Sequence, residues 1–143
     1  MLVGRVPDPD TVLDRVRDAL ASDLLLPTAL ARLVTVERTV RFDASDAAAA
    51  LTAAAESFLD RLAGGSFYVR LERRGLKGRL HSPTLERDIG THLWRALEAR
   101  GDHPRVDFAD PDAVVLIETL GEEGGLAIVT RAMRHAYPFV RVP

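Results

Sequence analysis

Residues 113–117, with the sequence Ala-Val-Val-Leu-Ile, constrain the fold more than any other part of the chain. Five consecutive apolar residues of strand-forming type, without alternation, are typical of a strand that lies at the centre of a sheet. The Asp110-Pro111-Asp112 turn precedes this run, and a glycine-rich segment at 121–125 connects it to a second apolar run at 126–130. The sequence therefore predicts a buried central strand that forms a hairpin with the strand after it.

The rest of the chain alternates between strand-like and helix-like patterns. Period-two alternation of apolar and polar residues predicts strands at 34–42 and 66–72, and a shorter strand is predicted at 2–6. Apolar residues at helical spacing predict three helices, at 8–26, 43–62 and 82–100. A short helix or turn with an extended tail is expected after residue 130. This order favours an α+β fold in which helices pack on one mixed β-sheet, with a small N-terminal α/β part.

Single residues refine these helix predictions. Gly90 lies in the middle of the 82–100 helix, where glycine costs about 1 kcal/mol relative to alanine, so we expect another backbone to pass close to it. His92 and Trp94 are two positions apart on the same helix and therefore point to different faces. Helix packing explains these two side chains better than a shared ligand does.

Composition excludes several classes of site. With 143 residues the chain has the length of one ordinary domain, and it contains no cysteine, so disulfides, thiolate metal sites and cysteine nucleophiles are excluded. Its four histidines have no paired ligand spacing, and we predict neither a metal nor a cofactor. No segment has the length and apolarity of a signal peptide or membrane span, so we expect a cytoplasmic protein without membrane contact.

One short segment departs from the net charge of −2 of the whole chain. Residues 70–81, called here the basic segment, contain five basic residues and a histidine against the single acid Glu72, and they connect a predicted strand to a predicted helix start at Ser82. Glycines let a backbone approach a ligand, and arginine side chains and free helix-start amides bind phosphates. Tyr68 flanks the segment, where it and the histidine are placed to stack on a base. The predicted RNA-binding residues are Arg70, Arg73, Arg74, Lys77, Arg79 and His81.

The alternative to RNA binding is a structural role, in which these arginines form a solvated strand edge that discourages sheet pairing. Other chemical signals are weaker still. The glycine-rich segment at 121–125 contains two glutamates, which repel phosphate, and is better explained as a hairpin loop. Asp107, Asp110, Asp112 and Glu118 resemble a carboxylate cluster, but Asp-Pro-Asp is also what a tight turn requires. No nucleophile motif is present, and we predict no catalytic residue.

Three blocks of sequence, at 66–75, 81–93 and 106–118, together resemble the THUMP domain. This is an RNA-binding module of tRNA thiouridine synthases, RNA methylases and pseudouridine synthases, and the similarity is greatest to stand-alone THUMP proteins that act as adapters for a tRNA cytidine acetyltransferase. The resemblance implies a THUMP-like RNA-binding domain at 31–143, preceded by an N-terminal βα extension at 1–30. It also implies the tRNA acceptor region as ligand, and it matches the arginines of the basic segment to the basic strand end of the family.

The sequence is compatible with three functions, each from a different class of protein. The first is a non-catalytic module that binds tRNA or another structured RNA and presents it to a separate RNA-modifying enzyme. The second is a protein–protein interaction module without direct RNA contact, whose basic segment meets an acidic surface. The third is an enzyme in its own right, which the sequence supports least.

Overall fold

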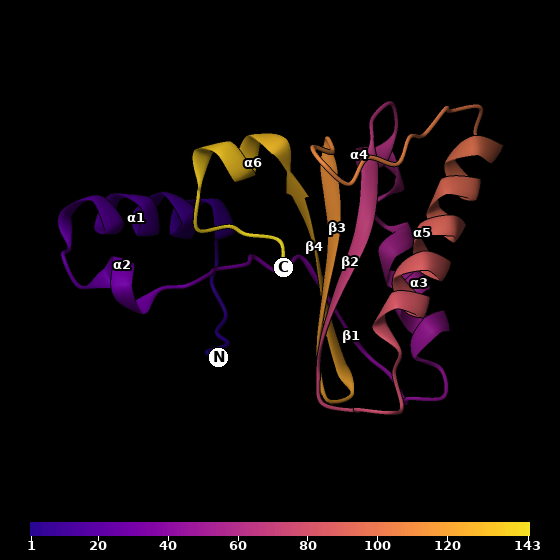
Figure 1. Cartoon of the computed structure of the whole chain (residues 1–143), viewed down its shortest axis with the longest axis horizontal. Coiled ribbons are helices and arrows are strands. Elements are labelled where there is room, and N and C mark those ends of the chain that lie inside the picture. Colours follow the sequence, from indigo (N-terminus) through magenta and orange to yellow (C-terminus); the bar gives the residue numbers. More distant parts are fainter.

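The computed structural model, which describes residues 1–143, is built around one four-stranded sheet (Figure 1). The strands are β1 (Arg38–Arg41), β2 (Phe67–Arg74), β3 (Ala113–Leu120) and β4 (Glu123–Thr130), in the spatial order β1-β4-β3-β2. β3 pairs antiparallel with β4 and parallel with β2, so the sheet is mixed and the predicted hairpin is confirmed. The wholly apolar run of β3 lies at the centre, as predicted, because it is paired on both sides.

Three helices cover one face of the sheet: α3 (Ala47–Glu56), α4 (Leu59–Leu62) and α5 (Ser82–Ala99) (Figure 1). The apolar stripe of α5 recurs every three to four residues, which places it against the sheet along the whole helix. Its four stripe residues are all buried, and the alternating side chains of β2 at Phe67, Val69 and Leu71 meet them from the sheet. The stripe consists of Leu85, Ile89, Leu93 and Leu97.

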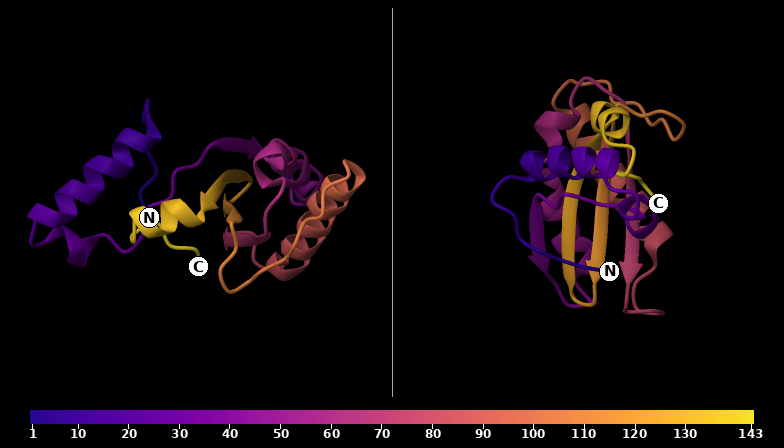
Figure 2. Two further views of the ribbon diagram at one scale, coloured as in Figure 1. Left: turned by 90° about the horizontal axis from the view of Figure 1, so that it is seen from above. Right: turned by 90° about the vertical axis from the view of Figure 1, so that its left-hand side faces the viewer.

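The opposite face, called here the open face, carries a smaller apolar cluster. Leu13 of α1 (Pro9–Ser22) packs there with Val114 and Leu116 of β3 and with the C-terminal tail. The short helices α2 (Leu26–Ala29) and α6 (Arg131–Ala136) lie on the same side. Figure 2 shows α1 crossing the upper part of the sheet, while the lower ends of the strands extend beyond it. Helix α1 therefore shares a core with the sheet.

Five local predictions differ from the structure. The helix predicted at 8–26 ends at Ser22, and the separate helix α2 begins at Leu26. The strand predicted at 2–6, the β part of the N-terminal βα extension, is absent, because these residues are exposed and hydrogen-bond to no sheet edge. The strand predicted at 34–42 is shortened to Arg38–Arg41, and the preceding residues pack on the open face instead. The predicted 43–62 helix begins only at Ala47 and is split into α3 and α4. A Cβ at Gly90 would meet the side chain of Val69 at 3.7 Å, and not another backbone.

The packing role predicted for Trp94 is confirmed, whereas His92 is exposed and forms a polar contact instead. Trp94 Nε1 donates a hydrogen bond to the carbonyl of Pro104 at 3.1 Å, and its ring packs partly buried against the larger core. His92 Nε2 lies 2.5 Å from Oε1 of Glu56, which joins α5 to α3. None of the helices is long and apolar enough to cross a membrane.

Candidate nucleic-acid interface

β2 divides the basic segment between the two faces of the sheet. Successive side chains of a strand point to opposite faces, so Arg70 and Arg74 lie on the open face with Tyr68 and Glu72, whereas Arg73 follows Leu71 on the helix face. β2 is also an edge strand, because it pairs only with β3. The predicted binding residues therefore surround the end of one edge strand.

Arg70 is held at this edge by two neighbours. Its Nη1 lies 3.7 Å from Oε1 of Glu86, and its guanidinium carbon lies 5.5 Å from the centroid of the Tyr68 ring. The same Glu86 oxygen accepts a hydrogen bond from the backbone N–H of Leu71 at 2.7 Å. Glu86 thus protects a free edge N–H of the sheet and partly balances the charge of Arg70.

Arg74 has a carboxylate partner as well. Its Nη2 lies 3.3 Å from Oε1 of Glu72, and the other oxygen of Glu72 lies 3.4 Å from Nη2 of Arg32, in the segment before β1. Nη1 of Arg32 also lies 2.6 Å from Oε1 of Glu118 on β3. The open face therefore carries a half-buried network of alternating charges, in which Arg74 is one member and not a free cation.

The remaining cations lie in and beside the loop at 75–81. Two apolar side chains anchor this loop, since Leu80 is buried in the larger core and Leu76 packs against it. Gly75 and Gly78 adopt positive φ values of 90° and 80°, which lets the chain turn sharply between β2 and α5. Between these anchors Lys77 and Arg79 are exposed to solvent. The loop is therefore fixed at its base and presents charge at its tip.

Arg73, Lys77 and Arg79, called here the loop cations, have no carboxylate within ion-pair distance. Nη1 of Arg73 donates a hydrogen bond to the carbonyl of Gly75 at 2.7 Å, which directs its guanidinium along the loop. None of the three takes part in any of the ion pairs of the structure. Lys77 and Arg79 are exposed and Arg73 is half-buried. Cations without carboxylate partners are the ones that can exchange counterions for phosphates.

His81 serves as the N-cap of α5. Its Nδ1 accepts a hydrogen bond from the backbone N–H of Thr84 at 3.3 Å and lies 2.6 Å from the hydroxyl oxygen of that residue. One of the free helix-start amides is therefore already satisfied by the protein. Tyr68 lies at the beginning of β2 and His81 follows its end, so these two rings do not flank a common base site.

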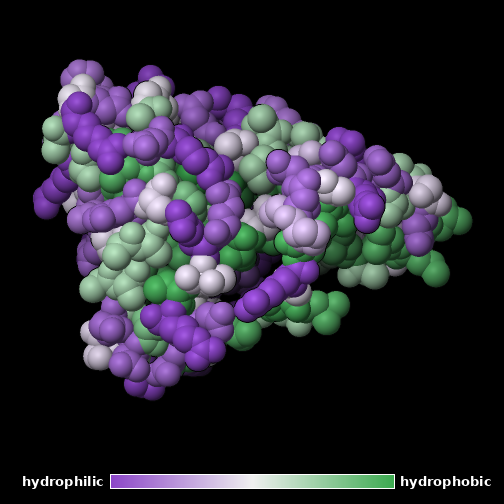
Figure 3. Space-filling view, turned by 180° about the vertical axis from the view of Figure 1, so that it is seen from behind, coloured by the Kyte–Doolittle hydropathy of each residue, from purple (hydrophilic) through white to green (hydrophobic).

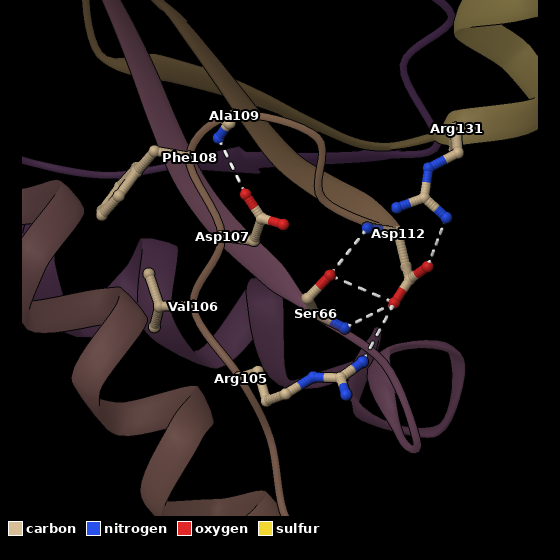
Figure 4. A pocket seen from close by; sticks show the side chains of 8 residues that line it. All are labelled: Ser66, Arg105, Val106, Asp107, Phe108, Ala109, Asp112 and Arg131. Atoms are coloured by element: carbon tan, nitrogen blue, oxygen red, sulfur yellow. Dashed lines mark hydrogen bonds and ion pairs between the residues drawn. The ribbon is translucent and has the colours of Figure 1, made fainter.

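A second feature lies at the other end of β2, where an open pocket of about 670 Å³ is lined by the residues drawn in Figure 4. Asp112 lies at its centre: Oδ2 accepts hydrogen bonds from the N–H and hydroxyl of Ser66 at 2.7 and 3.1 Å, and Oδ1 from Nη1 of Arg131 at 2.7 Å. The Ser66 N–H is the main cause of a lowered pKa for Asp112. This carboxylate joins the starts of β2, β3 and α6.

The other carboxylates of the predicted cluster also have structural partners. Oδ1 of Asp107 accepts the backbone N–H groups of Ala109 and Asp110, and these bonds lower the pKa of Asp107. Asp110 binds Arg131 at 3.0 Å, and this hydrogen bond is the main cause of the raised pKa of Arg131. The structural interpretation of the Asp-Pro-Asp turn is thereby confirmed.

Sequence reasoning missed two residues of this surface. Arg32 lies in a segment without strong periodicity, and nothing local indicates that it crosses the open face to Glu72 and Glu118. Phe108 lies before the Asp-Pro-Asp turn, and its ring is 72% exposed. The only indication in the sequence was the alternation of Val106 and Phe108 with the polar Asp107.

A family model described as the THUMP domain matches residues 47–129. Because this match covers more than half of the 143 residues, the chain belongs to the THUMP domain family. The predicted resemblance to this family is confirmed, and membership associates the chain with RNA binding and tRNA modification. The narrower similarity to acetyltransferase adapters stays a prediction.

Individual relatives agree with this assignment. The chain is similar to a probable tRNA sulfurtransferase of Methanosarcina acetivorans, at 34% identity over an alignment of 79 residues; the match covers 48% of this chain and 19% of that protein. It is also similar to TrmN from Thermus thermophilus, with a TM-score of 0.52 and 31% identity over 65% of this chain and 27% of that chain. The chain thus spans about a fifth of the length of the curated relative.

A further solved structure, a 4-thiouridine synthetase in complex with RNA and ATP, is similar in fold. The TM-score is 0.50 at 14% identity, and the match covers 90% of this chain and 38% of that chain. At this identity the likeness concerns the fold alone. It supports the mixed-sheet α+β architecture predicted from the sequence.

Proposed function

We propose that the protein is a non-catalytic module that binds tRNA or a similarly structured RNA and presents it to a separate RNA-modifying enzyme. Support comes from the family match and from a relative whose name is that of a probable tRNA sulfurtransferase. The single observation that carries the proposal is the group of loop cations, Arg73, Lys77 and Arg79. They lie where an edge strand passes into a helix, and they have no carboxylate partners.

The chemistry of phosphate recognition fits this group. Arginine guanidinium groups form paired hydrogen bonds with phosphate oxygens, and lysine acts as a mobile point charge. Arg70 and Arg74 lie beside the loop, but each forms an ion pair with a glutamate, which reduces the positive charge available to a phosphate. We therefore expect the three loop cations to supply most of the electrostatic affinity.

The non-catalytic part of the proposal is supported by the hydrogen bonds that the acidic side chains already accept within the protein. Asp107 accepts two backbone amides, and Asp112 accepts hydrogen bonds from Ser66 and Arg131. Lowered pKa values keep both carboxylates ionised near neutral pH, which makes them unsuitable as general acids. The modification step would then belong to another polypeptide.

A protein-interaction module is the second candidate function, and a specific surface favours it. Figure 3 shows apolar surface at the end of the molecule that the N-terminal segment forms. Leu24 and Leu25, between α1 and α2, are exposed. Contact with a partner protein would cover such side chains. Both functions are compatible if this end contacts the enzyme while the loop cations hold RNA.

A titration of labelled tRNA separates these candidates. The test protein carries Arg73→Ala, Lys77→Ala and Arg79→Ala together, and the control carries Arg5→Ala, Arg15→Ala and Arg95→Ala, which removes equal charge from exposed residues without ion pairs. We expect the loop variant to bind at least about tenfold more weakly at physiological salt, with the control close to wild type. Equal affinities for the two variants would refute the assigned role of the loop cations.

A further inference from the structure

Phe108 is an aromatic ring that folding leaves largely in water. Its centroid lies 5.3 Å from that of Tyr68, with the two planes tilted by 40°, so one side of the ring is backed by a second aromatic. The ring is nevertheless 72% exposed, whereas Tyr68 is half-buried on the open face. The pair presents an accessible aromatic surface above the beginning of β2.

Internal packing does not explain this arrangement. Phe108 belongs to neither apolar cluster of the protein, and its neighbour Val106 is also 55% exposed. Figure 4 shows Val106 and Phe108 pointing to the same side, away from the carboxylates of Asp107 and Asp112. The 105–109 segment therefore displays two apolar side chains toward solvent, on the side away from Asp107.

The charges around this surface favour a base over a phosphate. Inside the pocket, the carboxylates of Asp107 and Asp112 balance Arg105 and Arg131, so no net positive charge remains there. Arg105 itself is 73% exposed and lies 4.0 Å from Asp112, which leaves its planar guanidinium free to pack beside a ligand. Aromatic rings and guanidinium planes are the groups on which unstacked nucleobases bind.

We propose that Phe108, supported from behind by Tyr68, is a stacking platform for one unpaired nucleobase of the bound RNA. The inference rests on the proposed RNA-binding function and adds a second contact point to it. Tyr68 precedes Arg74 by six strand residues, which corresponds to about 20 Å along β2. The platform therefore contacts a part of the RNA other than the phosphates held by the loop cations, and stacking requires that part to be unpaired. Stacking tolerates all bases, so little sequence preference is expected.

The test compares two RNA hairpins that share one stem, one blunt and one with a short single-stranded tail that carries a fluorescent adenine analogue. Affinities are measured for wild type, Phe108→Ala, Phe108→Leu and Phe108→Trp. Leu24→Ala is the control, because Leu24 is apolar, 92% exposed, and located between α1 and α2, outside β2 and the loop cations. Since Phe108 is mostly in solvent, these variants are expected to fold.

With a stacking platform, Phe108→Ala and Phe108→Leu weaken binding of the tailed hairpin roughly tenfold and abolish quenching of its fluorescent base. Phe108→Trp and Leu24→Ala leave both properties near wild type, and no variant changes binding of the blunt hairpin. Unchanged binding and quenching in Phe108→Ala overturn the platform while leaving the proposed function intact. Failure of wild type to bind either hairpin overturns both proposals. A Phe108-dependent protein partner, with RNA binding unaffected, also overturns the platform.

Discussion

Arg32 and Glu118 form an ion pair at 2.6 Å that joins the segment before β1 to the open face of the sheet. Glu118 lies directly opposite Glu72 in the parallel β2–β3 register, and Arg32 also approaches Glu72 at 3.4 Å. All three side chains are less than one-third exposed. Arg32 therefore separates two like charges that the sheet places side by side, and it fixes the N-terminal segment there.

Replacement of Arg32 by leucine is expected to lower the free energy of unfolding by roughly 1–3 kcal/mol, because it leaves two half-buried carboxylates facing each other. Chemical denaturation measures this loss. Arg15→Leu, at an exposed position without an ion pair, serves as control and should change stability by less than about 0.5 kcal/mol. Adding Glu118→Gln to the Arg32→Leu protein should recover part of the loss, and a further loss would contradict the repulsion argument.

Gly90→Ala is expected to stabilise the protein by about 0.5–1 kcal/mol. Alanine is the better helix former, and its Cβ would meet only Val69 at an ordinary contact distance of 3.7 Å. The matched contrast is Gly124→Ala on β4, whose Cβ would lie 2.8 Å from Cδ2 of the fully buried Leu51, and which should cost roughly 1–3 kcal/mol. Thermal unfolding of both variants checks the opposite signs. A less stable Gly90→Ala protein would show that α5 packs more tightly than described.

Asp112 makes folding stability dependent on pH. Hydrogen bonds from Ser66 depress its pKa in the folded protein below the ordinary value of 3.8. A group with a depressed folded pKa contributes stability above its unfolded pKa and loses it as pH falls through the folded pKa. Asp112→Asn should therefore be less stable than wild type near neutral pH, and the difference should close as pH falls below 3.8.

Urea unfolding at a series of pH values measures the difference between these two proteins. Other aspartates with depressed pKa values lose stability over the same range, but they are common to both proteins and cancel in the comparison. A gap between wild type and Asp112→Asn that is independent of pH would contradict the assigned role of the carboxylate.

Local periodicity was sufficient to predict the elements that position the interface. The stripe of α5, the alternation of β2 and the β3–β4 hairpin all depend on spacings within one segment, and each occurs where the sequence indicates. The strand at 2–6 failed because strand propensity does not supply a partner edge. Residues 2–6 have a strand-like sequence, but no neighbouring backbone forms hydrogen bonds with them.

Pairings between distant segments were not accessible from the sequence. The division of Arg70 and Arg73 between two faces follows from the β2 period. The ion pair of Arg70 with Glu86 and the contact of Arg32 with Glu72 depend instead on how α5 and the segment before β1 fold against β2. The contact of Phe108 with Tyr68 likewise joins residues forty positions apart in the chain. Such contacts depend on tertiary packing and leave no periodic signal.

The salt dependence of RNA binding tests the central claim most directly. Each phosphate neutralised by a cation contributes about −0.9 to the slope of log affinity against log salt concentration for a duplex. If the loop cations each contact one phosphate, the Arg73→Ala, Lys77→Ala, Arg79→Ala protein should have a slope shallower than wild type by roughly two to three. The Arg5→Ala, Arg15→Ala, Arg95→Ala control should keep the wild-type slope. Identical slopes for wild type and the loop variant would contradict the claim that these three cations hold the RNA backbone.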